Sequence, residues 1–184
     1  MGVFDGHSDV GSPAIPGTAR YDPMADEYTL TAGGVNMWGT RDEFHFVWTR
    51  LTGAFTVTAR VAFTGNGPEP HCKAGIIARP CLEDNVSYVD AALHRDGLTA
   101  LQYRRRRSGI TEHVVSATRG ADTIRFERTG DRYTFSASAG SGPVVICDYA
   151  GAVLGNTVYV GLFLCAHNGA VNESAVFSDV RVMQ

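Results

Sequence analysis

The sequence predicts an all-β protein in which two antiparallel sheets pack as a sandwich or jelly roll. Three observations support this fold class. About a dozen short segments alternate apolar and polar residues, as strands with one buried face do. Clusters of glycine, proline, asparagine and aspartate separate these segments at regular intervals. No stretch shows the 3.6-residue apolar period of an amphipathic helix.

The strands can be assigned in chain order from this alternation. Many turn-forming residues precede the first expected strand, and a long hairpin with an aromatic buried face is expected to turn at Gly53. A second hairpin, at residues 88–106, turns at Arg95–Gly97 and is the segment most informative about function. The expected strands lie at residues 28–31, 44–49, 55–63, 73–79, at the two arms of 88–106, and at 111–116, 122–128, 133–137, 144–147, 157–166 and 174–183.

The composition is that of an ordinary soluble protein, with 44% apolar and 19% charged residues. The 184 residues suffice for one substantial core, so we expect a single domain over residues 1–184. A net charge of −3 gives no general attraction to nucleic acid or to an anionic membrane, and we expect neither partner. The first residues lack a secretory signal, which favours a cytoplasmic location.

The cysteines favour buried free thiols over a zinc site. They contain no C-x-x-C pair, and two of them lie in apolar segments typical of strands. The four are Cys72, Cys81, Cys147 and Cys165.

Alternation in the 88–106 hairpin separates an apolar face from a polar one. If Val89, Ala91 and Leu101 face the core, the residues between them face the other way. Neighbouring strands contribute further polar residues by the same argument, and tryptophan could add a ring on which a sugar stacks. The candidate ligand-binding residues are Lys73, Arg79, Tyr88, Asp90, His94, Gln102, Arg104, His45, His167 and Trp38, whereas Trp48 is in phase with Phe44 and Phe46 and is expected in the core.

Each of these residues also has a simpler interpretation. A polar residue at every second position is what the solvent side of an antiparallel sheet contains, and Asp90 could form only an ion pair with Arg104 or Lys73. The arginines at residues 104–107 are expected to lie at a solvent-exposed end of the hairpin, since alternation divides their side chains between two faces. Clustering on adjoining strands is what favours a shared groove.

Several longer segments point to a known family. They lie at residues 42–48 (DEFHFVW), 73–79 (KAGIIAR), 94–104 (HRDGLTALQYR), 160–167 (VGLFLCAH) and 175–180 (AVFSDV). Together they resemble the concanavalin A-like jelly-roll domains of the DUF1349 type, and the resemblance covers nearly the whole chain. Similar domains are attached to TolB-like β-propellers and stand beside bacterial glycoside-processing modules. The resemblance implies a sandwich with a concave face, in a clan that mostly binds or cleaves saccharides, although the DUF1349 group itself has no settled activity.

Three functional hypotheses follow. The first is a lectin-like, carbohydrate-binding jelly roll that recognises a saccharide or glycoside on its concave face. The second is a glycoside hydrolase or lyase, acting for example on keto-sugars, with Asp90 and His94 as the candidate catalytic proton-transfer groups. The third is a protein-interaction module without a small ligand. No cofactor is required for the first, a calcium-like divalent metal stays open, and the chain is expected to be a monomer or a homodimer.

Overall fold

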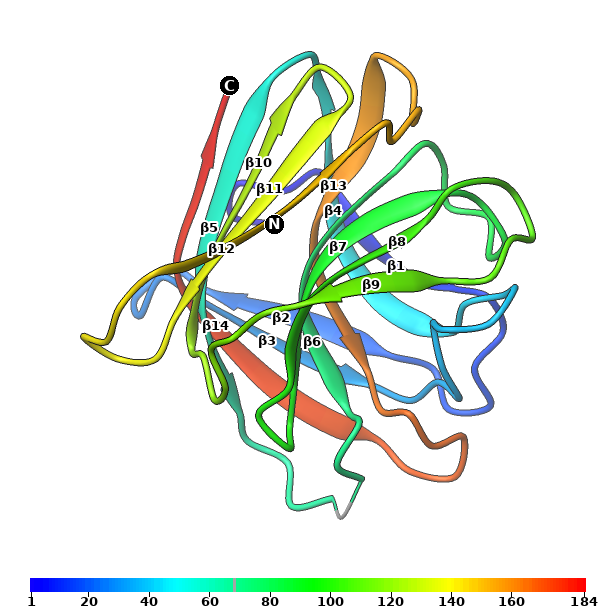
Figure 1. Ribbon diagram of the computed structural model, residues 1–184. Helices are drawn as coiled ribbons and strands as arrows, with labels where there is room; N and C mark the ends of the chain where they lie inside the picture. The colour runs from blue at the N-terminus through cyan, green and yellow to red at the C-terminus, as the bar shows by residue number, and fades with distance from the viewer. Residues whose placement is uncertain (68) are drawn as a thin grey trace.

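Two seven-stranded antiparallel sheets pack face to face in the computed structural model, which describes residues 1–67 and 69–184 (Figure 1). In spatial order, the first sheet contains β1 (Gly6–Val10), β4 (Phe44–Thr52), β13 (Thr157–Cys165), β6 (Lys73–Arg79), β7 (Tyr88–His94), β8 (Thr99–Arg104) and β9 (Glu112–Val115). The second contains β12 (Val145–Ala150), β11 (Arg132–Ser138), β10 (Thr123–Thr129), β5 (Phe55–Phe63), β14 (Glu173–Met183), β3 (Glu27–Ala32) and β2 (Thr18–Asp22). The predicted all-β sandwich is confirmed. Within the described residues, no helix is long and apolar enough to cross a membrane.

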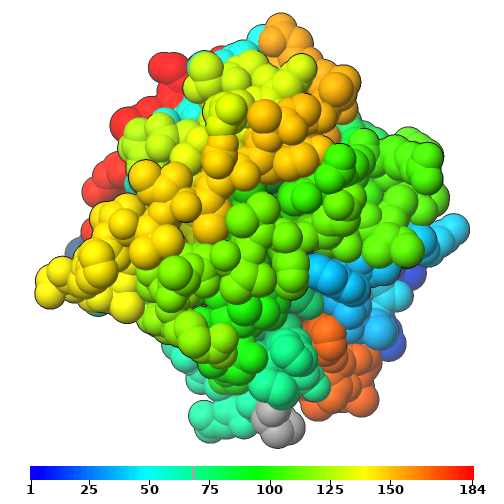
Figure 2. All heavy atoms as spheres, in the orientation of Figure 1, coloured from blue at the N-terminus to red at the C-terminus, as the bar shows by residue number. Residues whose placement is uncertain are grey.

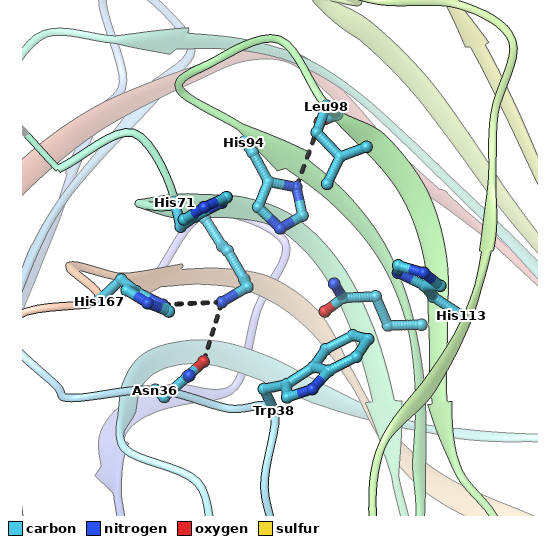
Figure 3. A pocket seen from close by; sticks show the side chains of 9 residues that line it. Asn36, Trp38, His71, His94, Leu98, His113 and His167 are labelled. Carbon is cyan, nitrogen blue, oxygen red and sulfur yellow. Dashed lines mark hydrogen bonds between the residues drawn. The ribbon is translucent and has the colours of Figure 1, made fainter.

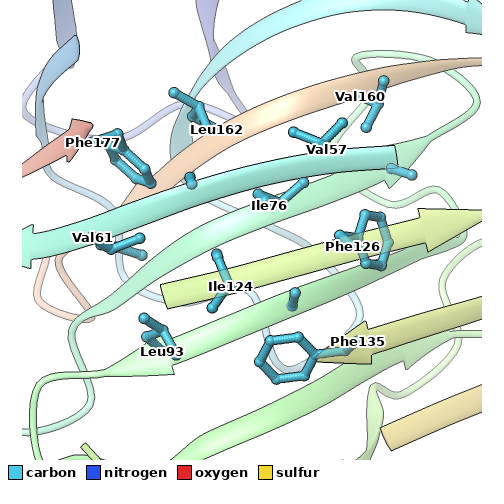
Figure 4. Close-up of a cluster of buried hydrophobic side chains, with 14 of the residues drawn as sticks. Val57, Val61, Ile76, Leu93, Ile124, Phe126, Phe135, Val160, Leu162 and Phe177 are labelled. Atoms are coloured by element: carbon cyan, nitrogen blue, oxygen red, sulfur yellow. The ribbon is translucent and has the colours of Figure 1, made fainter. Parts of the chain in front are cut away.

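The main hydrophobic core lies between the two sheets. Figure 4 shows its side chains converging from strands of both layers, with Val57 and Phe126 of the second sheet opposite Ile76 and Val160 of the first. The alternation predicted for β13 is confirmed, because its apolar residues of one parity lie in this core and those of the other parity do not. Burying one such side chain contributes about 1.5–3 kcal/mol. The cysteines are free thiols, as expected, although Cys81 is partly exposed.

Strands β7 and β8 form the predicted hairpin. Their register pairs Tyr88 with Arg104 and Asp90 with Gln102, and Gly97 adopts a φ of 87° in the turn. Only glycine adopts this left-handed conformation without strain. Val89, Ala91, Leu93 and Leu101 face the main core, so the polar residues of the hairpin lie on the outer face of the first sheet, the face turned away from the second sheet.

The predicted hairpin over residues 44–63 is wrong. Strands β4 and β5 follow one another in the chain, but β4 pairs with β1 and β13, whereas β5 pairs with β10 and β14. Gly53, with a φ of 79°, turns the chain from one sheet to the other. Alternation alone cannot distinguish a hairpin from an arch between sheets, because both place one parity of each strand in the core.

The face of β4 that lies between the two sheets is also not the predicted one. Phe44 and Phe46 belong to a second apolar cluster, on the outer face of the first sheet, with Met37, Ile77 and Phe163. Trp48 packs against this cluster and is only partly buried. The placement expected for these aromatic residues, between the sheets, is therefore wrong, and Val47 and Leu51 hold that position.

Two strands near the N-terminus were not predicted. β1 and β2 are short and lie at sheet edges, where one side has no neighbour and the apolar pattern is weak. Gly6 of β1 faces the Trp48 ring so closely that a Cβ atom there would lie 3.1 Å from it. The region of turn-forming residues thus contains strands that are recognisable only from their partners.

Candidate functional site: a hollow on the outer face of the first sheet

A cavity of about 270 Å³ opens on the outer face of the first sheet, over β6, β7 and β8 (Figure 3). Segments far apart in the sequence form its wall, and Figure 2 shows blue, teal, green and orange atoms meeting on the lower part of the face drawn. We call this cavity the hollow. Its lining residues are Asn36, Trp38, His71, Lys73, His94, Leu98, Gln102, His113 and His167.

Lys73, the first residue of β6, is 2% exposed and brings a primary amine into the hollow. Its Nζ donates to Asn36 Oδ1 at 2.9 Å and lies 3.2 Å from His167 Nδ1, as the dashed lines in Figure 3 mark. Burial lowers the pKa of Lys73, because the amine loses hydration that stabilises its charged form. No carboxylate touches this amine within the part of the chain that the structure describes.

His94, the last residue of β7, is held in one tautomer. Its Nδ1 lies 3.2 Å from the carbonyl oxygen of Leu98, and a carbonyl only accepts, so Nδ1 carries the proton. Burial, helped by the neighbouring charge of Lys73, lowers the pKa of His94 to about 3. The ring is therefore neutral at pH 7, and Nε2 is an acceptor. Figure 3 shows that nitrogen turned away from Leu98, toward the interior of the hollow.

Gln102 of β8 supplies a second acceptor. The side chain is 1% exposed, and its Oε1 is buried without a hydrogen-bond partner among the described residues. Such an atom costs about 1–3 kcal/mol unless water or a ligand satisfies it.

Aromatic and imidazole rings form the rim. Trp38 and His113 meet edge to face with their centroids 4.9 Å apart, and His71 lies 5.5 Å from His167 by the same measure. The backbone N–H of Thr111 donates to the carbonyl of Trp38, which fixes this loop against the edge of the sheet. The rim therefore offers both ring surface and polar edges.

A second group of polar residues on the same outer face is closed to solvent. Arg104 donates to both carboxylate oxygens of Asp42, at 2.8 Å to Oδ2 and 2.6 Å to Oδ1, and Arg79 donates to Oδ2 at 3.2 Å. The guanidinium of Arg104 also lies over the ring of Tyr88, whose hydroxyl donates to the carbonyl of Met37 at 2.6 Å. We call Asp42, Arg79, Tyr88 and Arg104 the sealed network, since all four are essentially unexposed.

The structure brings five of the ten predicted ligand-binding residues into the hollow. The predicted residues that meet in the hollow are Lys73, His94, Gln102, His167 and Trp38. Arg79, Tyr88 and Arg104 lie on the expected face but in the sealed network, so their expected place in an open groove is wrong. The physical reason is the loop that carries Asp42, which covers that end of the strands and supplies hydrogen-bond acceptors to both guanidinium groups.

His45 does not reach the hollow. Its register partner across β13 is Leu164, a residue of the main core, so it has core parity rather than the outer parity expected. There its Nδ1 lies 2.7 Å from Asp9 Oδ1, and its Nε2 lies 3.0 Å from His7 Nδ1. The error has the same origin as that for Phe44 and Phe46, because the assumed phase of β4 was reversed.

Asp90 is 0% exposed and is not among the residues that line the hollow. Neither carboxylate oxygen has a hydrogen-bond partner within the described chain, and burial raises the pKa of Asp90 well above its usual value. It stands four residues from His94 on one strand, about 13 Å along it. The two side chains are therefore too far apart to hydrogen-bond to one another, and Asp90 forms no ion pair with Arg104 or Lys73.

Four lining residues escaped the sequence analysis: Asn36, His71, Leu98 and His113. The first three lie outside strands and His113 lies on the exposed edge strand β9, so alternation carries no signal for them. Four of the six histidines line the hollow, a clustering that only the structure shows. In the described part of the chain, no three metal-ligating side chains converge on a point that could hold a metal ion.

No family model and no curated protein matches the chain. Solved structures do. A functionally unknown protein from Saccharomyces cerevisiae is 19% identical with a TM-score of 0.66, over 91% of this chain and 95% of that one. The carbohydrate-binding module CBM66 from Bacillus subtilis is 16% identical with a TM-score of 0.66, over 100% and 99%. The lectin UEA-II, complexed with galactose, is 8% identical with a TM-score of 0.53, over 97% and 92%. At such identities the likeness shows the fold alone, a jelly roll of two packed antiparallel sheets.

Proposed function

We propose that this protein is a carbohydrate-binding jelly roll and that the hollow is its saccharide site. The observation that carries the proposal is the convergence of three buried polar side chains from adjacent strands on one cavity. Lys73, His94 and Gln102 lie on β6, β7 and β8, and all three side chains line the hollow. Buried polar groups of this kind are kept in proteins when a partner satisfies them.

The hydrogen-bonding inventory suits a sugar. Gln102 Oε1 and His94 Nε2 accept hydrogen bonds, and Lys73 donates them, so vicinal hydroxyl groups of a sugar have matching partners. Trp38 adds a ring at the rim for the apolar side of the sugar. The cavity lies just below the usual range of ligand pockets, about 300–1,000 Å³, which favours one sugar unit over a long stretch of polymer.

Two further arguments support the proposal by analogy. The described fold is shared with a carbohydrate-binding module and with a lectin complexed with galactose. Fold does not determine function, so the shared fold supports the proposal only by analogy, and the hollow supplies the candidate site. The second argument is the resemblance of the sequence to DUF1349-type domains, and we include membership of that group in the proposal.

Calorimetric titration with a panel of monosaccharides and methyl glycosides tests the proposal. We expect millimolar or tighter binding to at least one of them, and Gln102→Ala should weaken it about 5- to 100-fold, because a ligand hydroxyl loses its acceptor. Gln184→Ala is the matched control, since that glutamine is exposed at the C-terminus. Failure of every saccharide to bind at millimolar concentration would overturn the proposal.

A further inference from the structure

The ionisable residues that line the hollow are all basic. They are Lys73, His71, His94, His113 and His167, and no aspartate or glutamate among the described residues lines the cavity. A typical mixed surface alternates both signs of charge, whereas this cavity offers one cation and several imidazole rings. The basic lining of the hollow therefore repels cations, and no carboxylate of the described residues offsets its positive charge.

Lys73 is buried without a counter-ion. Its polar neighbours are an amide oxygen and an imidazole nitrogen, and none of the salt bridges in the described residues includes it. Asp90 and Glu69 act on it only from a distance. Burying a charge is costly unless an opposite charge lies in contact with it. An anionic group that entered the hollow would supply that contact.

Lys73 is also the only lysine in the sequence. Every other residue that carries a fixed positive charge is an arginine, including the two arginines of the sealed network. Lysine presents a compact point charge, whereas the broad guanidinium fork of arginine would occupy more of a small cavity. The one compact cation of the chain thus lies in the cavity that has room for a ligand.

We infer that the hollow takes a sugar acid, a saccharide unit bearing a carboxylate that pairs with Lys73 while its hydroxyl groups donate to Gln102 Oε1 and His94 Nε2. The inference rests on the proposed function and narrows its substrate class. One carboxylate matches one buried ammonium, and hydroxyl donors satisfy the two free acceptors.

The pKa of Lys73 makes the inference testable through pH. Burial lowers this pKa, and a bound carboxylate would raise it again by stabilising the ammonium form. Binding of the acid is therefore linked to protonation of Lys73. The affinity for the sugar acid should fall as the pH rises and Lys73 loses its proton, whereas the affinity for a neutral sugar should change little.

Matched pairs of ligands test the inference by calorimetry. Methyl β-glucuronide is compared with methyl β-glucoside, the galacturonide with the galactoside, and acetate serves as the carboxylate alone. We expect each uronide to bind at least about tenfold more tightly than its neutral partner and than acetate. In Lys73→Gln the two members of a pair should bind equally, while Arg125→Gln, an exposed change on the second sheet, should keep the difference.

The outcomes separate this inference from the proposed function. Equal binding of neutral and acidic sugars by the wild type would overturn the inference and leave saccharide binding intact. If neither class binds, both fall. If acetate binds as tightly as the uronides, the site holds a small anion and the sugar acid is ruled out.

A second experiment does not depend on a variant that folds. Because the chain has one lysine, acetylation of an ε-amine reports Lys73 alone, and mass spectrometry can follow it against the α-amine of Met1. A uronide should slow acetylation of Lys73 several-fold and leave Met1 unchanged, and a neutral glycoside at equal concentration should slow it less. Equal protection by both ligands would contradict the inference.

Discussion

The hollow and the sealed network occupy opposite ends of the same three strands, on the same face of the first sheet. Lys73 and Arg79 stand at the two ends of β6, about 20 Å apart along the strand. At one end the polar side chains line a cavity, and at the other a loop places Asp42 and several carbonyl groups against the guanidinium groups. Strand alternation thus selects the face, and the covering loops decide whether a polar residue on it can bind a ligand.

The two regions also treat charge differently. In the sealed network two arginines share one carboxylate, and burial raises the pKa of Asp42 while the two guanidinium groups oppose that shift. In the hollow, the lone charge of Lys73 has no carboxylate in contact within the described residues. We therefore expect mutations to affect mainly stability in the network and mainly binding in the hollow.

The largest expected effect is that of Asp42→Asn. It removes the carboxylate that Arg79 and Arg104 share, while both arginines stay buried, and should lower the free energy of unfolding by about 3–5 kcal/mol. Denaturant titration measures this value. Asp148→Asn, which breaks an exposed pair with Arg132, should cost less than about 1 kcal/mol. A similar small loss for both variants would show that the network does not stabilise the fold.

Acid should destabilise the protein through His94. Its pKa is about 3 in the folded state and about 6.5 when unfolded, so between these values only the unfolded chain binds the proton. Stability therefore falls as the pH drops below 6.5, by up to about 1.4 kcal/mol per pH unit from this residue. We expect His94→Gln to flatten the dependence of unfolding free energy on pH between 6.5 and 4.5, while the exposed His113→Gln keeps the wild-type slope. Identical slopes in all three proteins would refute the assignment.

Methionine substitutions should separate the two ends of the face. Lys73→Met removes a buried charge that has no counter-ion among the residues that the structure describes, so the free energy of unfolding should stay within about 0.5 kcal/mol of the wild type or rise. Arg104→Met instead leaves Asp42 with one partner and should lower it by about 3 kcal/mol. Thermal and denaturant unfolding both report the difference. The comparison fails if Lys73→Met proves the more damaging change.

The smallest expected effect is optical. The chain has two tryptophans, of which Trp38 lines the hollow and Trp48 packs beside Tyr159. In Trp48→Phe the remaining indole should change its emission when a saccharide binds, and in Trp38→Phe the emission should stay constant. Losing the indole from the rim should weaken binding only a few-fold, corresponding to about 0.5–1.5 kcal/mol.

Alternation was sufficient to predict the β7–β8 hairpin and the outer position of Lys73, His94 and Gln102, because their segments have one consistently apolar parity. It failed for β4, where Phe44 and Phe46 are as apolar as Val47 and Leu51. Both faces of that strand are buried, so the period-two pattern does not tell which of them meets the other sheet.

The sequence also does not predict that the sealed network is closed to solvent. In the sequence, Asp42 stands out only as part of the segment 42–48, and its pairing with Arg104 spans 62 residues. Contacts of such separation depend on how a loop folds back over the sheet, which local pattern does not encode. The lining residues from loops, Asn36 and His71 among them, were missed for the same reason.

The most direct test of the central claim is a saccharide titration of ¹⁵N-labelled protein followed by its amide resonances. We expect the largest shifts at residues 36–38, 71–73, 94–98, 102, 113 and 167, and negligible shifts at Arg79, residues 83–86 and Arg104. Shifts centred on the network, or on the second sheet, would contradict the claim that the open end of this face is the binding site.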